Sequence, residues 1–299
     1  MAVGFPSHST RSRKVPEAPP RGNSQARRLL TCVNPGAETW FDGVMEPVVK
    51  AKVTSNGGSR AMPNPKTVLH AFNSFACYSE PERLLLQGMF ASPTAHEPGT
   101  ELISTGAPFD GPRLILSGWA YSAVNFVDGR RQIIDFYLPS DVMGLSTRPG
   151  ARAPASFFAL SKLVTVPADP LVPPLDQRER FPGLWKACQA IEGRQEFRHV
   201  QQIVRLGRQL ARERMASLLL DIYRRLERLG VRGDEPFEMP ATQEILGDAL
   251  GLSTVHINRT LQDLRHEGLI RISHGSMQVL DLPRLAALAG EMPSERMHN

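Results

Sequence analysis

The stretch TQEILGDALGLSTVHINRTLQDLRHEG, residues 242–268, constrains the fold more than any other part of the chain. It contains two short amphipathic segments that are interrupted at Gly251. Thr242 is a suitable N-cap for the first segment, with Gln243 and Glu244 in its first turn. The apolar positions share one helical face: Ile245, Leu246, Ala249 and Leu250. We expect this helix to end at Gly251, because glycine takes the left-handed conformation that helix ends favour.

Ser253 predicts the start of a second helix, since its side chain can cap the first free amides. Ile257, Leu261 and Leu264 recur at steps of four and three, so they are predicted to face inward. The positions left facing outward are Thr254, Val255, Asn258, Arg259 and Gln262. Two short helices joined by a tight glycine turn, the second with a polar outer face, predict a helix-turn-helix.

The second helix of such a motif fits the major groove of DNA. Arginine can donate to guanine O6 and N7, and asparagine can pair with adenine. The methyl groups of Val255 or Thr254 can meet a thymine methyl. The predicted DNA-contacting residues of this helix are Ser253, Thr254, Val255, His256, Asn258, Arg259 and Gln262.

The stretch EGLIRISHGSMQVLDL follows directly and predicts a β-hairpin wing. We expect strands over 269–272 and 277–280, with a turn at His274-Gly275-Ser276. Wings usually contact phosphate, and the candidates are Arg271, His274 and Ser276. A plain helical hairpin without DNA binding is the alternative interpretation of the two helices.

Residues 1–66 are rich in Pro, Gly, Ser, Asn and Arg and predict a disordered basic tail. The alternatives are a gene start placed too early, with Met62 as the initiator, or a basic arm that contacts phosphate. The whole chain has 299 residues and a net charge of +5, but residues 1–70 carry ten Lys/Arg and only four Asp/Glu. The remainder is therefore close to neutral, and the basic composition alone does not indicate nucleic-acid binding.

A β-rich block follows a short helical segment that we predict within residues 67–92. The β-branched and aromatic runs are TELIS, RLILSGWAYSAVNFV, RRQIIDFYLP and ASFFALSKLVTVP, separated by Pro and Gly turn signals. Asp128-Gly129 predicts a tight hairpin, because glycine supplies the positive φ that the turn needs. Several short strands at this spacing predict a small antiparallel barrel or jelly roll.

Residues 184–230 are predicted to be helical, with turn signals only at Gly193 and Gly207. A long helix with a narrow apolar stripe usually packs on another helix, and a symmetric dimer partner is our prediction. The alternative is that the helix only covers the barrel. Residues 230–239 are predicted to form a loop.

This order of elements resembles the Crp/Fnr family of bacterial transcription regulators over about residues 70–290. LILSGWAYSAVNFVDGRRQIIDFYLPSDVMGL, residues 114–145, looks like the family's barrel core, and LGDALGLSTVHINRTLQDLRHEGLI looks like its helix-turn-helix. The resemblance implies an α+β fold in three domains. They are a cyclic-nucleotide-binding-like antiparallel β-barrel or jelly-roll sensor (67–180), dimerisation and linker helices (181–230) and a winged helix-turn-helix (231–290). The implied partners are double-stranded DNA with a pseudo-palindromic operator, a second copy of the chain and RNA polymerase.

The resemblance also implies roles for single residues. Arg259 matches the family's base-reading arginine, and Asn258 stands where some members place a base-contacting serine. Val255 stands where the family has a base-reading glutamate, so the usual target half-site does not carry over.

The effector of such a sensor stays unidentified. The matching phosphate loop holds Gly144, Leu145, Ser146 and Arg152, but Gly144 is not followed by the family's Glu, and Arg152 is not followed by Ser or Thr. We therefore predict that cyclic nucleotide is not the ligand. Cys32, Cys77 and Cys188 are too few and too scattered for the family's iron–sulfur cluster. Haem bound through His70 or His96 stays open.

Two other classes of protein compete with the regulator. A cupin-like barrel enzyme would need paired histidines and a glutamate, and the barrel block offers only His96-Glu97. No other catalytic motif stands out, so we predict that the chain is not an enzyme. A ligand-binding signalling module would leave the outer face of residues 253–262 without a purpose. The sequence contains no apolar run of eighteen residues and no signal peptide, which predicts a cytoplasmic protein without a membrane partner.

Overall fold

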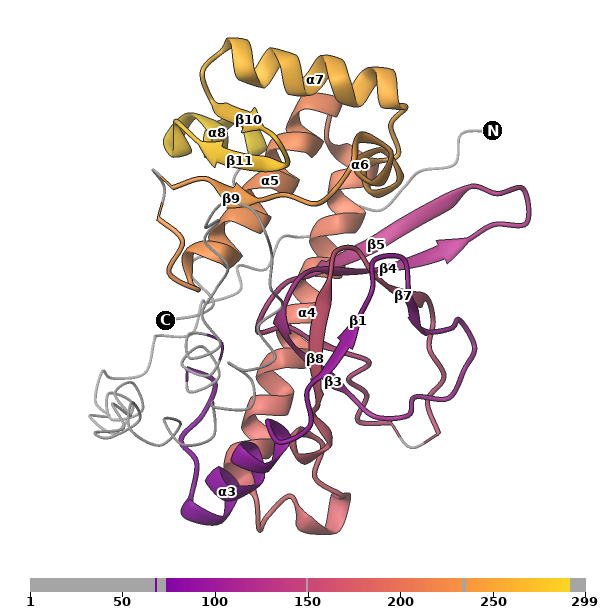
Figure 1. Cartoon of the computed structure of the whole chain (residues 1–299), viewed down its shortest axis with the longest axis vertical. Coiled ribbons are helices and arrows are strands. Elements are labelled where there is room, and N and C mark those ends of the chain that lie inside the picture. Colours follow the sequence, from indigo (N-terminus) through magenta and orange to yellow (C-terminus); the bar gives the residue numbers. More distant parts are fainter. Residues whose placement is uncertain (1–67, 69–73, 149, 233–234, 291–299) are drawn as a thin grey trace, which may run out of the picture. The chain divides into compact units, whose positions relative to one another are not determined.

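The computed structural model describes Val68 and residues 74–148, 150–232 and 235–290 (Figure 1). The predicted tail at 1–66, with Cys32 and Met62, and the haem candidate His70 lie outside the described residues. The predicted boundaries between domains stay predictions.

Two four-stranded antiparallel sheets make up the predicted jelly roll. One sheet has the strand order β1 (Thr94–His96), β8 (Leu163–Pro167), β3 (Arg113–Ser117), β6 (Val142–Met143). The other has the order β2 (Glu101–Ile103), β7 (Ser156–Ala159), β4 (Ala120–Asn125), β5 (Arg131–Tyr137). The jelly-roll prediction is confirmed. The sequence did not predict β1 and β6, because strands of three and two residues are too short to show an alternating pattern.

Apolar side chains fill the space between the two sheets. Ile115 of one sheet and Tyr137 and Phe157 of the other belong to one buried cluster. The rings of Tyr137 and Phe157 lie 5.5 Å apart between their centroids. The interior of the jelly roll is therefore a packed core, formed as each strand turns every second side chain inward.

The β4–β5 hairpin confirms the turn predicted at Asp128-Gly129. Gly129 has a φ of 85°, and the Phe126 N–H donates to the Arg130 carbonyl oxygen at 2.8 Å. The hairpin extends beyond the rest of its sheet in Figure 1. Glycine is needed here because the residue that closes such a turn takes a left-handed conformation.

Among the described residues, the longer helices before the helix-turn-helix are α3 (Glu80–Met89), α4 (Pro182–Arg208) and α5 (Ala211–Glu227). The prediction of one helical segment over 184–230 is wrong in one respect, because the backbone is extended at Gln209 and Leu210. Glu213 accepts a hydrogen bond from the Leu210 N–H at 2.8 Å and starts α5. Gly193 and Gly207 do not interrupt α4, since a glycine inside a helix costs only about 1 kcal/mol.

A largely buried cluster of four charges joins β5 and the turn after it to α4 and α5. Arg198 of α4 donates to Asp135 of β5 at 2.8 Å. Arg225 of α5 donates to Asp141, which directly follows the β5 strand and its turn, and to the Phe136 carbonyl oxygen. Arg198 also lies 3.6 Å from Asp141. The cluster ties the two helices to one edge of the jelly roll.

Glu82 of α3 connects that helix to the start of α4. Its buried carboxylate accepts hydrogen bonds from the backbone N–H groups of Gly183 at 2.7 Å and Leu184 at 3.0 Å. The same carboxylate accepts from both the N–H and the hydroxyl of Ser79. Burial raises the pKa of the Glu82 carboxyl, but these hydrogen bonds lower it more, so its pKa lies below the usual value.

We expect Glu82→Gln to lower the free energy of unfolding at pH 7 by about 1.5–3 kcal/mol, because charged acceptors form the stronger hydrogen bonds. The lowered pKa means that the unfolded chain binds more protons than the folded chain near that pKa. The Glu82 contribution is therefore present above the unfolded pKa of about 4.3 and is lost as the pH falls through the folded value. Denaturant titrations between pH 7 and pH 3 should show that the free energy of unfolding falls less with pH in the variant than in the unaltered protein. Identical pH profiles of the two proteins would contradict this role of Glu82.

Candidate nucleic-acid interface

Helices α6 (Gln243–Leu250) and α7 (Thr254–His266) form the predicted helix-turn-helix, and each begins and ends as expected. The Thr242 hydroxyl oxygen accepts from the Ile245 N–H at 3.2 Å. Gly251 ends α6 with a φ of 64°. The Ser253 hydroxyl oxygen accepts from the His256 N–H at 3.4 Å at the start of α7.

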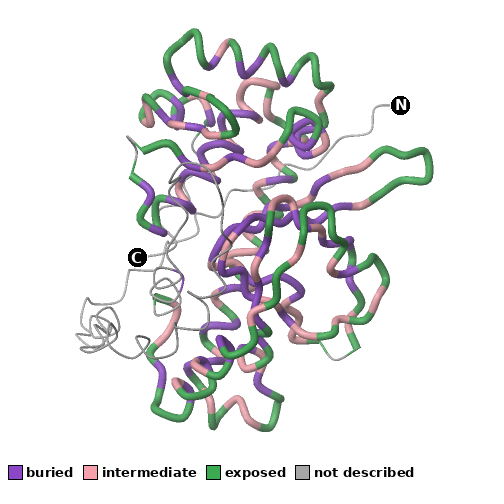
Figure 2. Tube along the Cα trace, viewed as in Figure 1, coloured by how far each residue is buried: buried purple, intermediate pink, exposed green. Residues whose placement is uncertain are grey.

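The two faces of α7 separate as the periodicity predicted. Ile257, Leu261 and Leu264 are buried, together with Thr260, whose burial the sequence did not indicate. All seven predicted contact residues of this helix are exposed: Ser253, Thr254, Val255, His256, Asn258, Arg259 and Gln262. Figure 2 shows the alternation of buried and exposed turns along α7. The apolar side chains anchor the helix in a core shared with α5 and α6 and leave its polar face exposed.

The wing consists of β10 (Ile270–Ser273) and β11 (Ser276–Val279), each within one residue of its predicted position. His274 and Gly275 form the turn with φ values of 47° and 74°. Residues 230–239, predicted as a loop, contain a third strand, β9 (Phe237–Glu238), which pairs with β11. The prediction missed it because two residues carry no periodic signal, and only the backbone of β11 provides its partner. The last helix is α8 (Leu282–Ala289).

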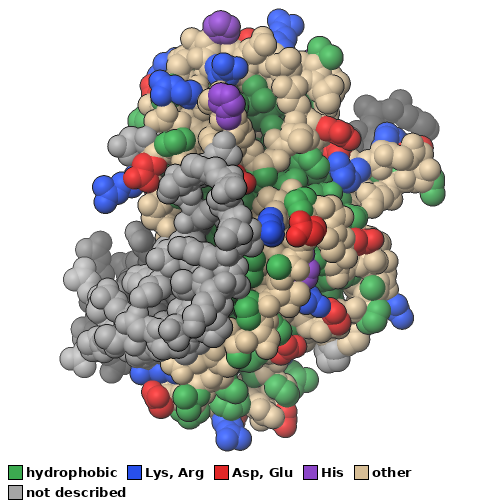
Figure 3. Space-filling view, viewed as in Figure 1, with side chains coloured by type: hydrophobic (Ala, Val, Ile, Leu, Met, Phe, Trp, Pro, Cys, Tyr) green, Lys and Arg blue, Asp and Glu red, His purple; other side chains and the backbone are tan. Residues whose placement is uncertain are grey.

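Positive and titratable side chains are exposed around α7 and the wing. Arg259 is exposed on α7, and Arg271 of the wing donates to the Gln278 side chain at 3.1 Å. The His256 ring lies 3.0 Å from the Ser253 hydroxyl, and the His274 ring 2.8 Å from the Ser273 hydroxyl. Ser276 is half-buried. In Figure 3, basic and histidine side chains appear over the end of the molecule that holds α7 and the wing.

Two features of the site were missed in the sequence. Gly247 lies under the turn between the helices, where a Cβ atom would meet the Leu252 carbonyl oxygen at 2.6 Å. Arg131 of β5 forms an ion pair with Asp248 of α6 at 2.6 Å. The spacing LGxxxG hinted at the first feature, but no local signal connects two residues that are 117 positions apart.

The predicted effector residues do not build a cyclic-nucleotide site. Gly144 packs against Ile103 and Phe109, so apolar side chains fill the space beside this loop. The exposed Arg152 donates to the Gly106 carbonyl oxygen at 2.7 Å, and Ser146 accepts from the Arg148 N–H at 3.3 Å. Leu145 is half-buried and packs against the cluster beneath α3 and α4. The loop presents no carboxylate for a ribose, and Arg152, the arginine that stands at the family's phosphate-binding position, already has a partner, so the residues present do not fit a cyclic nucleotide.

The other candidate ligand residues also have structural neighbours. The His96 Nε2 lies 3.0 Å from the Thr165 hydroxyl, between β1 and β8. Cys77 is exposed and Cys188 is buried. Within the described ranges, His, Cys, Asp and Glu side chains form no group of three that could hold a metal ion. No helix in the same ranges is long and apolar enough to cross a membrane.

Comparison with known proteins identifies the family. Residues 213–288 match the model of the Crp-like helix-turn-helix domain. The nitrogen fixation regulation protein FixK of Bradyrhizobium diazoefficiens is 30% identical over 163 residues, which cover 54% of this chain and 67% of that protein. The chain belongs to the Crp/Fnr family. AadR, a transcriptional activatory protein of Rhodopseudomonas palustris, is 35% identical, with 54% of this chain and 66% of that protein covered.

The longer matches support the same family. The transcriptional activator FnrL of Cereibacter sphaeroides is 28% identical over 66% of this chain and 80% of its own length. The solved structure of FixK2 from Bradyrhizobium japonicum has a TM-score of 0.59 at 24% identity, covering 67% of this chain and 98% of that chain, and supports the fold alone. Because Crp/Fnr relatives are transcription regulators, the prediction of a DNA-binding regulator rather than an enzyme is confirmed.

We expect Gly247→Ala to lower the free energy of unfolding by about 1–3 kcal/mol, because the added methyl group overlaps the Leu252 carbonyl oxygen. Gly88→Ala is the matched control, since Gly88 lies in α3 with open space around its Cβ position. That control should leave stability unchanged or raise it by up to about 1 kcal/mol. Thermal melts of both variants test the turn. An unchanged stability of Gly247→Ala would show that α6 and the turn to α7 can move apart to accept the methyl group without a loss of stability.

Proposed function

We propose that this Crp/Fnr protein binds a pseudo-palindromic DNA operator as a homodimer and regulates transcription together with RNA polymerase in the cytoplasm. The observation that carries the proposal is the outer face of α7, which is exposed along its whole length while its inner face is anchored in the core. Such a helix, followed by a wing, fits the major groove. The jelly roll then serves as the sensor for an effector that we leave unidentified.

The proposed base contacts come from the middle of α7. Arg259 donates two hydrogen bonds to a guanine, and Asn258 reads an adjacent base. Val255 is 74% exposed and supplies an apolar contact, for which a thymine methyl is the natural partner. Thr254, His256 and Gln262 complete this face, and Ser253 places the α7 N-terminus toward a phosphate.

Phosphate contacts come from Arg271, His274 and Ser276 of the wing in this proposal. The part of the chain beyond residue 70 is close to neutral, so few phosphates are neutralised by each copy. A dimer doubles these contacts and places two reading helices on one duplex, which compensates for the modest charge of each copy.

Dimerisation is proposed to use the outer side of α4. Val200 and Ile203 are exposed, with Phe197 and Val204 half-buried beside them, so an apolar stripe follows the helix. A groove of about 720 Å³ runs beside this stripe, between α4 and α5. We propose that α4 of a second copy packs against this stripe. The same contact would then cover the apolar stripes of both copies.

We expect Arg259→Ala to weaken operator binding by about 1–3 kcal/mol and to remove the preference at one base position of each half-site. Arg130→Ala is the control, since Arg130 lies on the β4–β5 hairpin, where its side chain contacts nearby Asp128 and the Phe126 ring. Selection of bound duplexes from a random pool, followed by affinity measurements, tests this. Equal affinity of the unaltered protein for every duplex would remove the basis of the proposed function.

We expect Ile203→Glu to raise the dissociation constant of the dimer by about 30-fold or more, because it places a charge in the apolar stripe. Leu84→Glu is a matched control, since Leu84 of α3 is also a highly exposed apolar residue but lies outside the stripe. Sedimentation at several concentrations measures both variants. A dimer that persists unchanged in Ile203→Glu would place the subunit contact elsewhere.

A further inference from the structure

The carboxyl end of α6 is bound by side chains from three other elements. The last four carbonyl groups of a helix have no partner within that helix. In α6, the first of these is satisfied by the backbone turn, as the N–H groups of Gly251 and Leu252 donate to the Gly247 oxygen. The remaining three carbonyl groups belong to Asp248, Ala249 and Leu250 and accept hydrogen bonds from outside the two helices of the motif.

Each remaining carbonyl oxygen accepts a hydrogen bond from a different side chain. Gln132 of β5 donates to the Asp248 oxygen at 2.9 Å. Gln202 of α4 donates to the Ala249 oxygen at 2.6 Å. Arg214 of α5 donates to the Leu250 oxygen at 2.9 Å. We call Gln132, Gln202 and Arg214, together with the Arg131–Asp248 ion pair, the α6 latch.

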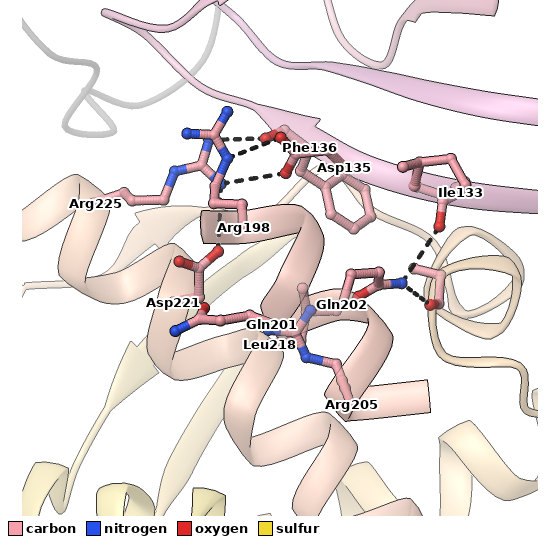
Figure 4. Close-up of a pocket in the computed structure, with 12 residues that line it drawn as sticks. Ile133, Asp135, Phe136, Arg198, Gln201, Gln202, Arg205, Leu218, Asp221 and Arg225 are labelled. Carbon is pink, nitrogen blue, oxygen red and sulfur yellow. Dashed lines mark hydrogen bonds and ion pairs between the residues drawn. The ribbon is translucent and has the colours of Figure 1, made fainter. Parts of the chain in front are cut away.

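The donors of the α6 latch are themselves held in place. The Gln202 side-chain oxygen accepts from the buried Arg205 guanidinium, which has only donors, so the Gln202 amino group must face α6. Figure 4 shows Gln202 between β5 and α6, on the side of α4 that faces the jelly roll. Arg131 donates through two nitrogens to Asp248, at 2.8 and 2.6 Å, and through a third to the Tyr121 hydroxyl at 2.9 Å. The α6 latch is therefore pre-organised.

The position of the α6 latch matters because the recognition helix starts immediately beyond it. Only Gly251 and Leu252 separate the end of α6 from Ser253, the N-cap of α7. Gln132, Arg131 and Gln202 all lie outside the matched helix-turn-helix residues, 213–288. Any rotation of the winged helix relative to β5 and α4 would break these bonds and leave polar groups of α6 unpaired.

We infer that the α6 latch sets the direction of α7 relative to α4 and thereby the spacing between the two operator half-sites. The inference rests on the proposed function, in which α4 forms the dimer contact and α7 reads the bases. With α4 fixed by the partner, the latch determines how far apart and at what angle the two α7 helices lie. Its members are positioning residues and touch no base.

The test compares operators that share one selected half-site sequence but differ in the number of base pairs between the half-sites. One added base pair moves a half-site by about 3.4 Å and turns it by about 35°. A rigid α7 pair should bind one spacing and reject its neighbours. We expect Arg131→Glu and Gln202→Leu to reduce that discrimination by about fivefold or more, the lower range of coupling between sites.

The controls separate positioning from folding. Asp248→Arg combined with Arg131→Glu recreates the ion pair in reverse and should restore discrimination lost in either single variant. Arg130→Glu makes the same charge change one residue away, without a contact to α6 in the described residues, and should behave as the unaltered protein. Where Gln202→Leu does not fold, Gln132→Leu, at a half-buried position, removes a single donor of the latch.

The possible results separate a failure of this inference from a failure of the proposed function on which it rests. Absence of sequence-selective binding by the unaltered protein overturns the proposed function and the inference with it. Selective binding with an unchanged spacing profile in folded, dimeric Arg131→Glu and Gln202→Leu proteins overturns the inference alone. Backbone relaxation of the α7 amides without DNA is a second readout, which should show faster independent motion of α7 in these variants, and unchanged motion would also contradict the latch.

Discussion

The largely buried pairing of Asp135 and Asp141 with Arg198 and Arg225 is the interaction on which the rest of the structure depends. Each of these ions loses several kcal/mol of hydration when it is buried, so each must have an opposite charge at hydrogen-bonding distance. Burial raises the pKa of the Asp141 carboxyl, but Arg225 and Arg198 lower it more, so it is held below its usual value and stays charged. Strand β5 with the turn that follows it, which carry the acids, and the helices that carry the arginines are consequently tied together.

From this cluster the two helices reach in different directions. The start of α4 is held by Glu82 of α3, and its middle exposes an apolar stripe. Helix α5 buries Met215, Leu219 and Ile222 in one core with α6, α7 and the wing. A single apolar core therefore continues from the β4–β5 sheet into the winged helix. The exposed face of α7 is supported by elements that lie far from it in the sequence.

The sequence predicted those parts of the molecule whose causes are local. The caps at Thr242 and Ser253, the left-handed Gly251 and the inward Ile257 follow from backbone chemistry and helical period. The predictions that were wrong or incomplete concern segments whose conformation depends on residues far away in the sequence. The break after Arg208 is an extended backbone that lets α5 turn away from α4, and β9 exists because β11 lies beside it. Neither cause can be seen within a window of a few residues.

The jelly roll shows the same division. Its strands were predicted from β-branched runs and turns, but the packed interior beside Gly144 follows only from the meeting of Ile103, Phe109 and the loop in space. What the sequence by itself determined is the order of the elements, the family and the outer face of the recognition helix, because periodicity and capping act over a few residues. Only the tertiary structure decided which distant side chains satisfy the end of α6 and which charges are buried together. Those choices depend on hydrogen bonds and ion pairs between residues up to 117 positions apart, whose energy exists only once the chain has folded.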